Sequence, residues 1–154
     1  MSSDPRTKPA VCNCLALRQA TRHVTQFYDQ LLASSGLRTT QFSILARLKL
    51  AGPMTINALA EALVMDRTTL GRNILPLQRQ GLIDVAPGRG DRRSKQLRLT
   101  DAGAARLRTA RKGWTEAQTR FESTFGDRRA AVLRAQLQAV AATDFDAAPG
   151  GARN

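Results

Sequence analysis

The sequence predicts a mainly α-helical chain that carries one β-hairpin. Apolar residues recur at helical spacing over most of its length, whereas two short runs near residues 83 and 97 alternate apolar and polar residues. The chain has 154 residues, of which 42% are hydrophobic, and this is enough for one compact domain. No apolar run approaches the roughly 18 residues that span a bilayer, and the N-terminus lacks a signal-peptide pattern. We therefore expect a cytoplasmic protein.

Two helices are predicted before residue 52. The first covers residues 12–33 and has an apolar residue at every seventh position, a stripe that favours packing against another long helix. The second covers residues 39–51 and ends before Gly52 and Pro53. The residues of the stripe are Leu17, Val24 and Leu31.

The next segment predicts two short helices joined by a tight turn. Thr55 is placed to cap the first, over residues 56–63, and Asp66 to cap the second, which extends to about residue 80. Gly81 stands where a glycine often ends a helix. The second helix exposes a polar and basic face, and this face with the tight turn is typical of a helix-turn-helix. Its exposed residues are Arg67, Thr68, Thr69, Arg72 and Asn73.

A β-hairpin follows the helix pair directly. Its strands, near residues 82–86 and 95–100, alternate apolar and polar residues, and residues 88–93 between them are rich in glycine and arginine. A basic hairpin behind a helix-turn-helix is a wing. Thr100 then caps a long helix, and a last helix covers residues 127–142. The predicted fold is therefore a winged helix-turn-helix with long helices before and after it.

The charge of the chain points to a polyanionic partner. Basic residues outnumber acidic ones 24 to 12, and the net charge of +12 favours nucleic acid first and an anionic membrane second. Residues 66–101 contain eight basic and four acidic residues. Aromatic residues make up 5% of the chain, too few for a platform that stacks single-stranded bases. The chain has one histidine and no glycine-rich phosphate loop, so we expect neither an enzyme nor a cofactor.

Three motifs in this order resemble the MarR family of winged helix-turn-helix regulators. They are LQRQGLI at residues 77–83, the wing sequence DRRS at 91–94, and LTDAG at 99–103. The resemblance covers nearly the whole chain and implies one unit over residues 12–145. In it, residues 12–36 and 101–145 are the dimerisation helices and residues 37–100 are the winged DNA-binding part. Polar tails at residues 1–11 and 146–154 are expected to be flexible.

The resemblance implies a homodimer that binds a pseudo-palindromic operator in double-stranded DNA. Its members regulate transcription, and we expect a repressor that a small-molecule or oxidant signal releases. The exposed residues of the second short helix would read the major groove, where arginine can grip guanine with two hydrogen bonds. On the wing, Asp91 would orient Arg93 into the minor groove, and Arg89 and Arg92 would contact phosphates.

Plainer interpretations of these residues stay open. Each arginine can be a solvated surface charge, and Asp91 and Arg93 can form an ion pair that only fixes the hairpin. At the level of function, the alternative is a basic or architectural protein that coats nucleic acid without sequence preference. Such a protein would bind random and specific duplexes equally well.

The first helix also resembles the organic-hydroperoxide-sensing branch of the family. That branch has a reactive cysteine at the position of Cys14 and a tyrosine at that of Tyr28. The two lie about 21 Å apart along one helix, so they meet only across a dimer. Arg18, on the same face as Cys14, would favour the thiolate, and Cys12 would supply a neighbouring thiol. The match is partial, because Arg18 and Thr39 stand where these sensors carry tyrosines.

Other interpretations of the first helix remain open too. Cys12 and Cys14 can be small buried residues near a helix start. With His23 they form no recognised zinc spacing, and we expect no bound metal. Most other members of the family bind small, often anionic ligands between the winged part and the dimer helices. In that interpretation Arg18, Arg22 and His23 would meet the anion.

Overall fold

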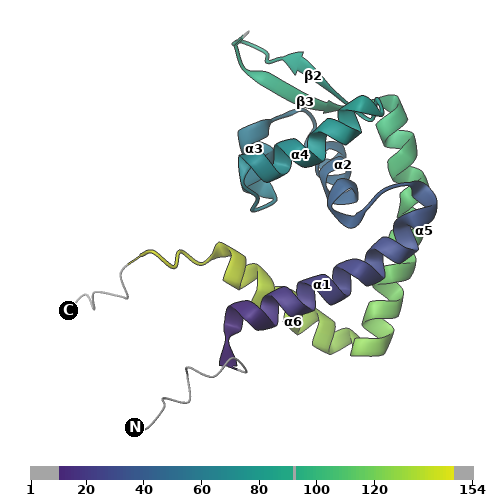
Figure 1. Ribbon diagram of the computed structural model, residues 1–154, viewed down its shortest axis with the longest axis vertical. Helices are drawn as coiled ribbons and strands as arrows, with labels where there is room; N and C mark the ends of the chain where they lie inside the picture. Colours follow the sequence, from purple (N-terminus) through teal and green to yellow (C-terminus); the bar gives the residue numbers. More distant parts are fainter. Residues whose placement is uncertain (1–10, 92, 148–154) are drawn as a thin grey trace. The chain divides into compact units, whose positions relative to one another are not determined.

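The computed structural model describes residues 11–91 and 93–147, and the chain forms two compact units, Met1–Ala117 and Gln118–Asn154. The first unit contains the helix-turn-helix and the wing (Figure 1). The expected winged helix-turn-helix fold is confirmed. The predicted tails lie almost wholly outside the described residues. No helix among the described residues is both long and apolar enough to cross a lipid bilayer.

Helix α1 (Asn13–Leu32) continues into a 3-10 turn that ends at Gly36, whose φ of 73° is left-handed. Helix α2 (Thr39–Ala51) depends on α1 for its start. The Asp29 Oδ1 atom accepts hydrogen bonds from the backbone N–H and from the hydroxyl of Thr39, each at 2.7 Å. A carboxylate at this point satisfies an N–H that has no partner within the helix. Helix α1 therefore carries the N-terminal cap of α2.

Helices α3 (Ile56–Ala62) and α4 (Arg67–Arg79) form the helix-turn-helix, and their caps are the predicted ones. The Thr55 hydroxyl caps α3. The Asp66 carboxylate caps α4, because it accepts hydrogen bonds from the N–H of Thr69 at 2.8 Å and from the Thr69 hydroxyl at 2.6 Å. These hydrogen bonds favour the charged form and hold the pKa of Asp66 below its ordinary value.

Both helices of this pair end in the same backbone motif. After α3, the Val64 N–H donates to the carbonyl oxygen of Glu61 at 3.1 Å, and the Met65 N–H donates to that of Ala60 at 2.8 Å. The motif needs a residue with left-handed backbone. Gly81 supplies it after α4 with a φ of 68°, whereas α3 uses Val64 with a φ of 50°. A β-branched residue in this conformation is strained by about 1–2 kcal/mol.

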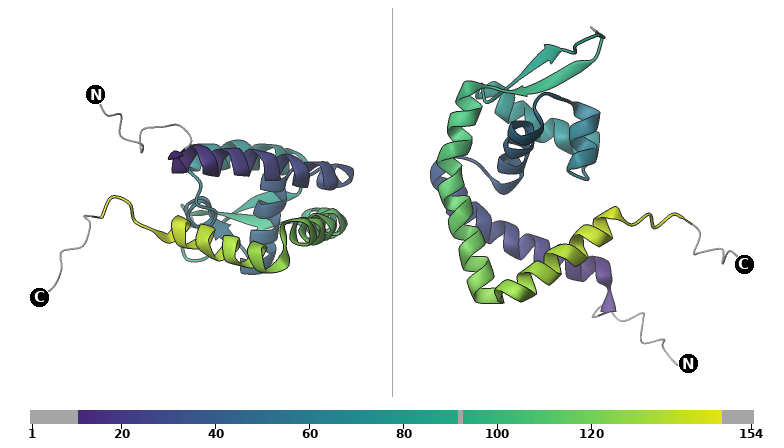
Figure 2. Two further views of the ribbon diagram at one scale, coloured as in Figure 1. Left: turned by 90° about the horizontal axis from the view of Figure 1, so that it is seen from below. Right: turned by 180° about the vertical axis from the view of Figure 1, so that it is seen from behind.

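The sheet has three antiparallel strands in the order β1-β3-β2, namely β1 (Met54–Thr55), β2 (Ile83–Pro87) and β3 (Lys95–Leu99). Strands β2 and β3 are the predicted hairpin, with Val85 opposite Leu97. Strand β1 was not predicted, because a two-residue strand shows no alternation. Leu97 on the central strand β3 is buried, whereas Val85 on the edge strand β2 is exposed. The end of the hairpin projects beyond the helices (Figure 2).

Helix α5 (Asp101–Phe125) begins at a junction with the end of α4. The Thr100 hydroxyl accepts a hydrogen bond from the Gly103 N–H at 3.0 Å, so it caps α5 as predicted. The same hydroxyl donates to the carbonyl oxygen of Gly81 at 2.6 Å. A Cβ at Gly103 would collide with the carbonyl oxygen of Leu82, so α5 packs directly on the backbone there.

The core of the first unit joins side chains from the helices and the sheet. Two contacts fix α5 against it. The Trp114 ring stacks on Phe42 with ring centroids 5.9 Å apart, and a Cβ at Gly113 would collide with the carbonyl oxygen of Leu31. Trp114 itself stays 37% exposed. The largest fully buried side chains are Leu32, Leu37, Ile44, Leu45, Leu48, Leu59, Leu70, Leu77, Leu82 and Ile83.

The second unit contains the end of α5 and helix α6 (Asp127–Ala142), which matches the predicted last helix. The chain turns between them at Gly126, where φ is 103°. The rings of Phe121 and Phe125 lie 5.5 Å apart, and the guanidinium carbon of Arg129 lies 4.2 Å from the centre of the Phe125 ring. Several apolar side chains of α6 remain exposed. They are Val132, Leu137 and Val140.

We expect the substitution Val64→Gly to raise the Tm by about 2–4 °C. Glycine adopts left-handed backbone without steric cost. The strain energy that it removes exceeds the free-energy cost of its greater unfolded-state entropy by about 1 kcal/mol. Val64 is 73% exposed, so little apolar burial is lost. Thermal melts followed by circular dichroism measure the change. Val132→Gly, at an exposed position inside α6, should lower the Tm, and an equal fall for Val64→Gly would contradict the assignment of strain.

We also expect the cap of α4 to stabilise the fold at neutral pH and to lose this effect in acid. Because the folded pKa of Asp66 is depressed, its contribution is complete above the unfolded pKa of about 4 and is lost as the pH falls through the folded pKa. Asp66→Ala should lower the Tm by a constant amount between about pH 7 and pH 5, and the difference should shrink below about pH 4. Asp66→Asn keeps an uncharged cap as the control. A difference of unchanged size at about pH 3 would exclude this role for the carboxylate.

Candidate nucleic-acid interface

Helix α4 buries one face and exposes the other. Leu70, Ile74 and Leu77 are buried in the core. The residues predicted to read DNA lie away from these three and reach the surface of the described chain. Four of the predicted residues are exposed and one is half-buried, and in chain order they are Arg67, Thr68, Thr69, Arg72 and Asn73.

Hydrogen bonds within α4 fix two of these five side chains. The Thr69 hydroxyl donates to the Asp66 carboxylate, and the amide of Asn73 donates to the carbonyl oxygen of Thr69 at 2.9 Å. Both side chains are therefore ordered before any ligand binds. The sequence pattern identified Asp66 as a cap but did not predict these two bonds.

The wing loop is closed by hydrogen bonds around Asp91 and Ser94. The Gly88 N–H donates to the carbonyl oxygen of Ser94 at 2.6 Å, and the Ser94 hydroxyl donates to that of Asp91 at 2.9 Å. The Asp91 carboxylate accepts a hydrogen bond from the backbone N–H of Arg93 at 2.9 Å. Asp91 thus orients Arg93 through its main chain, and Arg93 is exposed.

An ion pair across the wing strands was not predicted. Arg98 lies directly opposite Asp84 in the register of β2 and β3, and its Nε and terminal nitrogen donate to the two carboxylate oxygens, each at 3.0 Å. This pairing lowers the pKa of Asp84 and raises that of Arg98. Charge alternation alone did not reveal the pair, because the partners face each other only once the hairpin register is known.

The acidic residues of this region are engaged internally, while most of its basic residues remain exposed. Asp66, Asp84 and Asp91 each accept hydrogen bonds from their own helix or hairpin. Exposed basic residues outnumber these three carboxylates, so positive charge dominates the exposed parts of α4 and the wing. Arg92, a predicted phosphate contact, lies outside the described residues. The exposed basic residues are Arg67, Arg72, Arg79, Arg89, Arg93 and Lys95.

The two cysteines lie at the start of α1. Cys12 is the N-cap, and its Sγ accepts a hydrogen bond from the Leu15 N–H at 3.4 Å. Cys14 is in the first turn, and both thiols are free and exposed. One interpretation of the sequence expected them to be buried, and within the single chain they are not. Tyr28 lies on the same helix, where its ring meets that of Phe27 edge to face.

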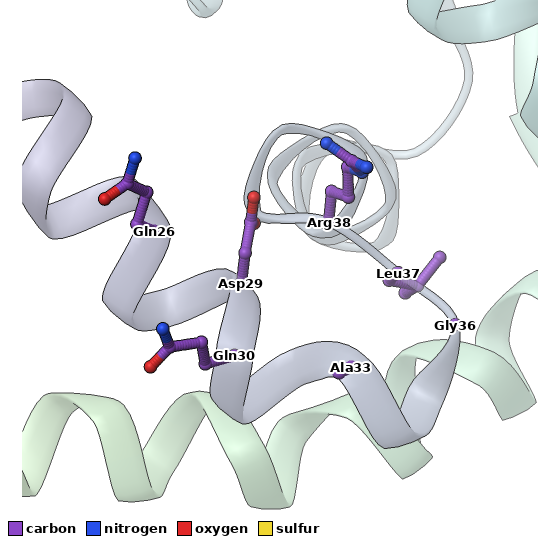
Figure 3. Close-up of a pocket in the computed structure, with 7 residues that line it drawn as sticks. All are labelled: Gln26, Asp29, Gln30, Ala33, Gly36, Leu37 and Arg38. Carbon is purple, nitrogen blue, oxygen red and sulfur yellow. The ribbon is translucent and has the colours of Figure 1, made fainter.

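A surface pocket of about 470 Å³ lies where α1 passes into α2. Figure 3 shows the Asp29 side chain pointing toward the start of α2, in agreement with its bonds to Thr39. Arg18, Arg22 and His23, the ligand residues expected from the sequence, lie on the exposed part of α1 and do not line this pocket. Within the described ranges, no three His, Cys, Asp or Glu side chains are grouped to hold a metal ion. The pocket is lined by Gln26, Asp29, Gln30, Ala33, Gly36, Leu37 and Arg38.

A family model and two curated relatives match this chain. The MarR family model matches residues 37–95. PecS, an HTH-type transcriptional regulator of Dickeya dadantii strain 3937, is 30% identical over 115 residues, which are 73% of this chain and 69% of PecS. NicR, an HTH-type transcriptional repressor of Pseudomonas putida KT2440, is 32% identical over 91 residues. That match covers 59% of this chain and 58% of NicR, so it spans less than two thirds of NicR.

Among solved structures, the Mycobacterium tuberculosis transcriptional regulator MosR in complex with DNA is similar in both fold and sequence. The TM-score is 0.70 and the identity is 35%, and the match covers 86% of this chain and 99% of MosR. The fold, the sequence motifs and the sequence identity to known regulators all indicate the same family. The chain belongs to the MarR family of DNA-binding transcriptional regulators.

Proposed function

We propose that the protein binds a specific operator in double-stranded DNA as a homodimer and represses transcription until a signal releases it. The observation that carries the proposal is the exposed positive charge of α4 and the wing, whose carboxylates are engaged internally. Duplex phosphates supply the complementary charge. NicR is a transcriptional repressor and MosR was solved with DNA, which supports the same partner here. A regulator of this kind acts on the chromosome, and we place it in the cytoplasm.

Helix α4 would enter the major groove with its N-terminal half against the bases. Arg67 and Arg72 are exposed, and each guanidinium can donate two hydrogen bonds to O6 and N7 of guanine. Thr68, exposed beside them, can meet a base or a phosphate. Thr69 and Asn73 would present groups already held in place by the helix, so ordering them on binding costs little conformational entropy.

The wing would lie along the adjacent minor groove. The hydrogen bond from the Arg93 N–H to Asp91 fixes the main chain from which the Arg93 side chain projects. A narrow minor groove concentrates negative potential and attracts an arginine. Arg89 and Arg92 would then contact the flanking phosphates.

A second copy of the chain would complete the regulator. The heptad stripe of α1 includes Leu17, which is exposed, and α6 exposes further apolar side chains. Burial of these residues against a partner would stabilise a dimer through the hydrophobic effect. Two winged units related by a twofold axis would read half-sites about one helical turn apart.

The thiols at the start of α1 are the candidate switch. A peroxide would oxidise the Cys14 thiolate to a sulfenic acid, with release of water or an alcohol, and the Cys12 thiol would then displace water to form a disulfide. Cys12 caps α1 through its sulfur, so a bond to Cys14 would remove the cap and disturb the first turn. Tyr28 of a partner copy would lie near Cys14 in this proposal.

We expect Arg93→Ala to weaken operator binding about tenfold or more, equivalent to about 1.4 kcal/mol. Arg72→Ala should in addition reduce the preference for the operator over random duplex, since it removes a base contact. Fluorescence anisotropy at several salt concentrations measures both, and wild-type affinity should fall steeply with salt. Arg111→Ala removes the same charge outside the interface as a control. Wild-type affinity for Arg93→Ala would exclude the wing contact, and equal affinity for operator and random duplex would favour the architectural alternative.

We expect hydrogen peroxide or an organic hydroperoxide to release the wild-type protein from DNA, and dithiothreitol to restore binding. Cys14→Ser should stay bound, because serine cannot form a sulfenic acid. Cys12→Ser tests the second thiol in the same gel-shift series. Equal release of wild type and Cys14→Ser would dismiss Cys14 as the sensor. A wild type that stays bound would overturn the thiol switch and leave a small ligand near Arg18, Arg22 and His23 as the signal.

A further inference from the structure

Gly71 lies in the interior of α4, among the residues proposed to read DNA. It is one turn beyond Arg67 and directly before Arg72. Around the helix axis it is about 40° from Arg67 and about 60° from Thr68. Glycine is one of the least favourable residues in a helix interior, so its presence at this position calls for a physical reason.

The fold itself supplies no such reason. Nine glycines lie in the described residues, and eight of them are explained by backbone or space. Five have a positive φ that favours glycine, and three lie so close to neighbouring atoms that a Cβ would collide. The first five are Gly36, Gly52, Gly81, Gly90 and Gly126, and the other three are Gly88, Gly103 and Gly113.

Gly71 differs from all eight. Its backbone is helical, and a Cβ at this position would meet nothing within 4 Å. Helix α4 also continues without interruption from Arg67 to Arg79, so the glycine does not break or end it. An alanine would therefore fit the folded chain and favour the helix. Neither backbone conformation nor space within the described chain accounts for the missing side chain.

We infer that Gly71 lets the edge of a base pair approach the backbone of α4 more closely than a side chain would allow, and so helps to determine operator specificity. The inference rests on the proposed function. Glycine is the usual residue where a ligand approaches the backbone closely. The exposed neighbours of Gly71 on the helix surface are Arg67 and Thr68 on its N-terminal side and Leu75 on its C-terminal side. Because the first two are proposed to read DNA, the ligand at this position is the duplex. The contact sets the depth of α4 in the groove and thereby the reach of both arginines.

The test combines stability and binding of two variants, Gly71→Ala and Gly71→Leu, with an operator duplex selected from random DNA by the wild type. Gly71→Ala should raise the Tm by about 2–4 °C, because alanine favours the helix. The same variant should bind the operator at least about tenfold more weakly, and Gly71→Leu more weakly still. A higher Tm together with weaker operator binding indicates a lost DNA contact, whereas a folding defect would lower both the Tm and the affinity.

Gln78→Ala serves as the control, since it also introduces alanine into α4, at an exposed position two turns nearer the C-terminal end than the half-buried Gly71. Its affinity should equal that of the wild type. Operator binding of Gly71→Ala within about twofold of the wild type would overturn the inference. The proposed function is judged separately, by the preference of the wild type for its operator over random duplex in the same assay.

Discussion

The arrangement of the winged part depends on the hydrogen bonds of Thr100. Its hydroxyl donates to the carbonyl oxygen of Gly81 and accepts a hydrogen bond from the Gly103 N–H, while the Thr100 N–H donates to the carbonyl oxygen of Leu82 at 3.2 Å. The end of α4, the end of β3 and the start of α5 thus meet at one residue. Because Gly103 has no side chain, α5 packs directly on this junction, and the close contact at Gly113 joins the same helix to α1.

Four acidic residues of the first unit make hydrogen bonds or an ion pair within the chain. Asp29 caps α2, Asp66 caps α4, Asp91 holds the wing loop and Asp84 pairs with Arg98. Each of these four carboxylates therefore stabilises local structure, and the charge of Asp84 is in addition paired with that of Arg98. The net charge of +12 belongs to the whole chain, whereas the structure shows that basic side chains are exposed on α4 and the wing.

Local patterns predicted most of the fold and the outline of the candidate site. The caps at Thr55, Asp66 and Thr100 were predictable because each acts within three residues of its own position. Contacts between distant residues were not. The bond from Thr39 to Asp29 and the pairing of β1 with β3 depend on how the chain folds back, which helical and strand periodicity do not encode. Gly71 gave no signal, since a single glycine inside a regular helical pattern is noticeable only once its surroundings are known.

The cap that Asp29 provides for α2 has a consequence for how the winged part can be separated from the rest. The match to the MarR family model, which we call the family signature, begins at residue 37, eight residues beyond Asp29. A fragment cut at that boundary would contain every residue of the signature and lack the carboxylate that starts its first helix. The reader of DNA and the long helix before it are therefore not independent modules: α2 is anchored by α1, and a tilt of α1 would reach α2 through the Asp29 carboxylate as well as through the packing of Leu32 in the core.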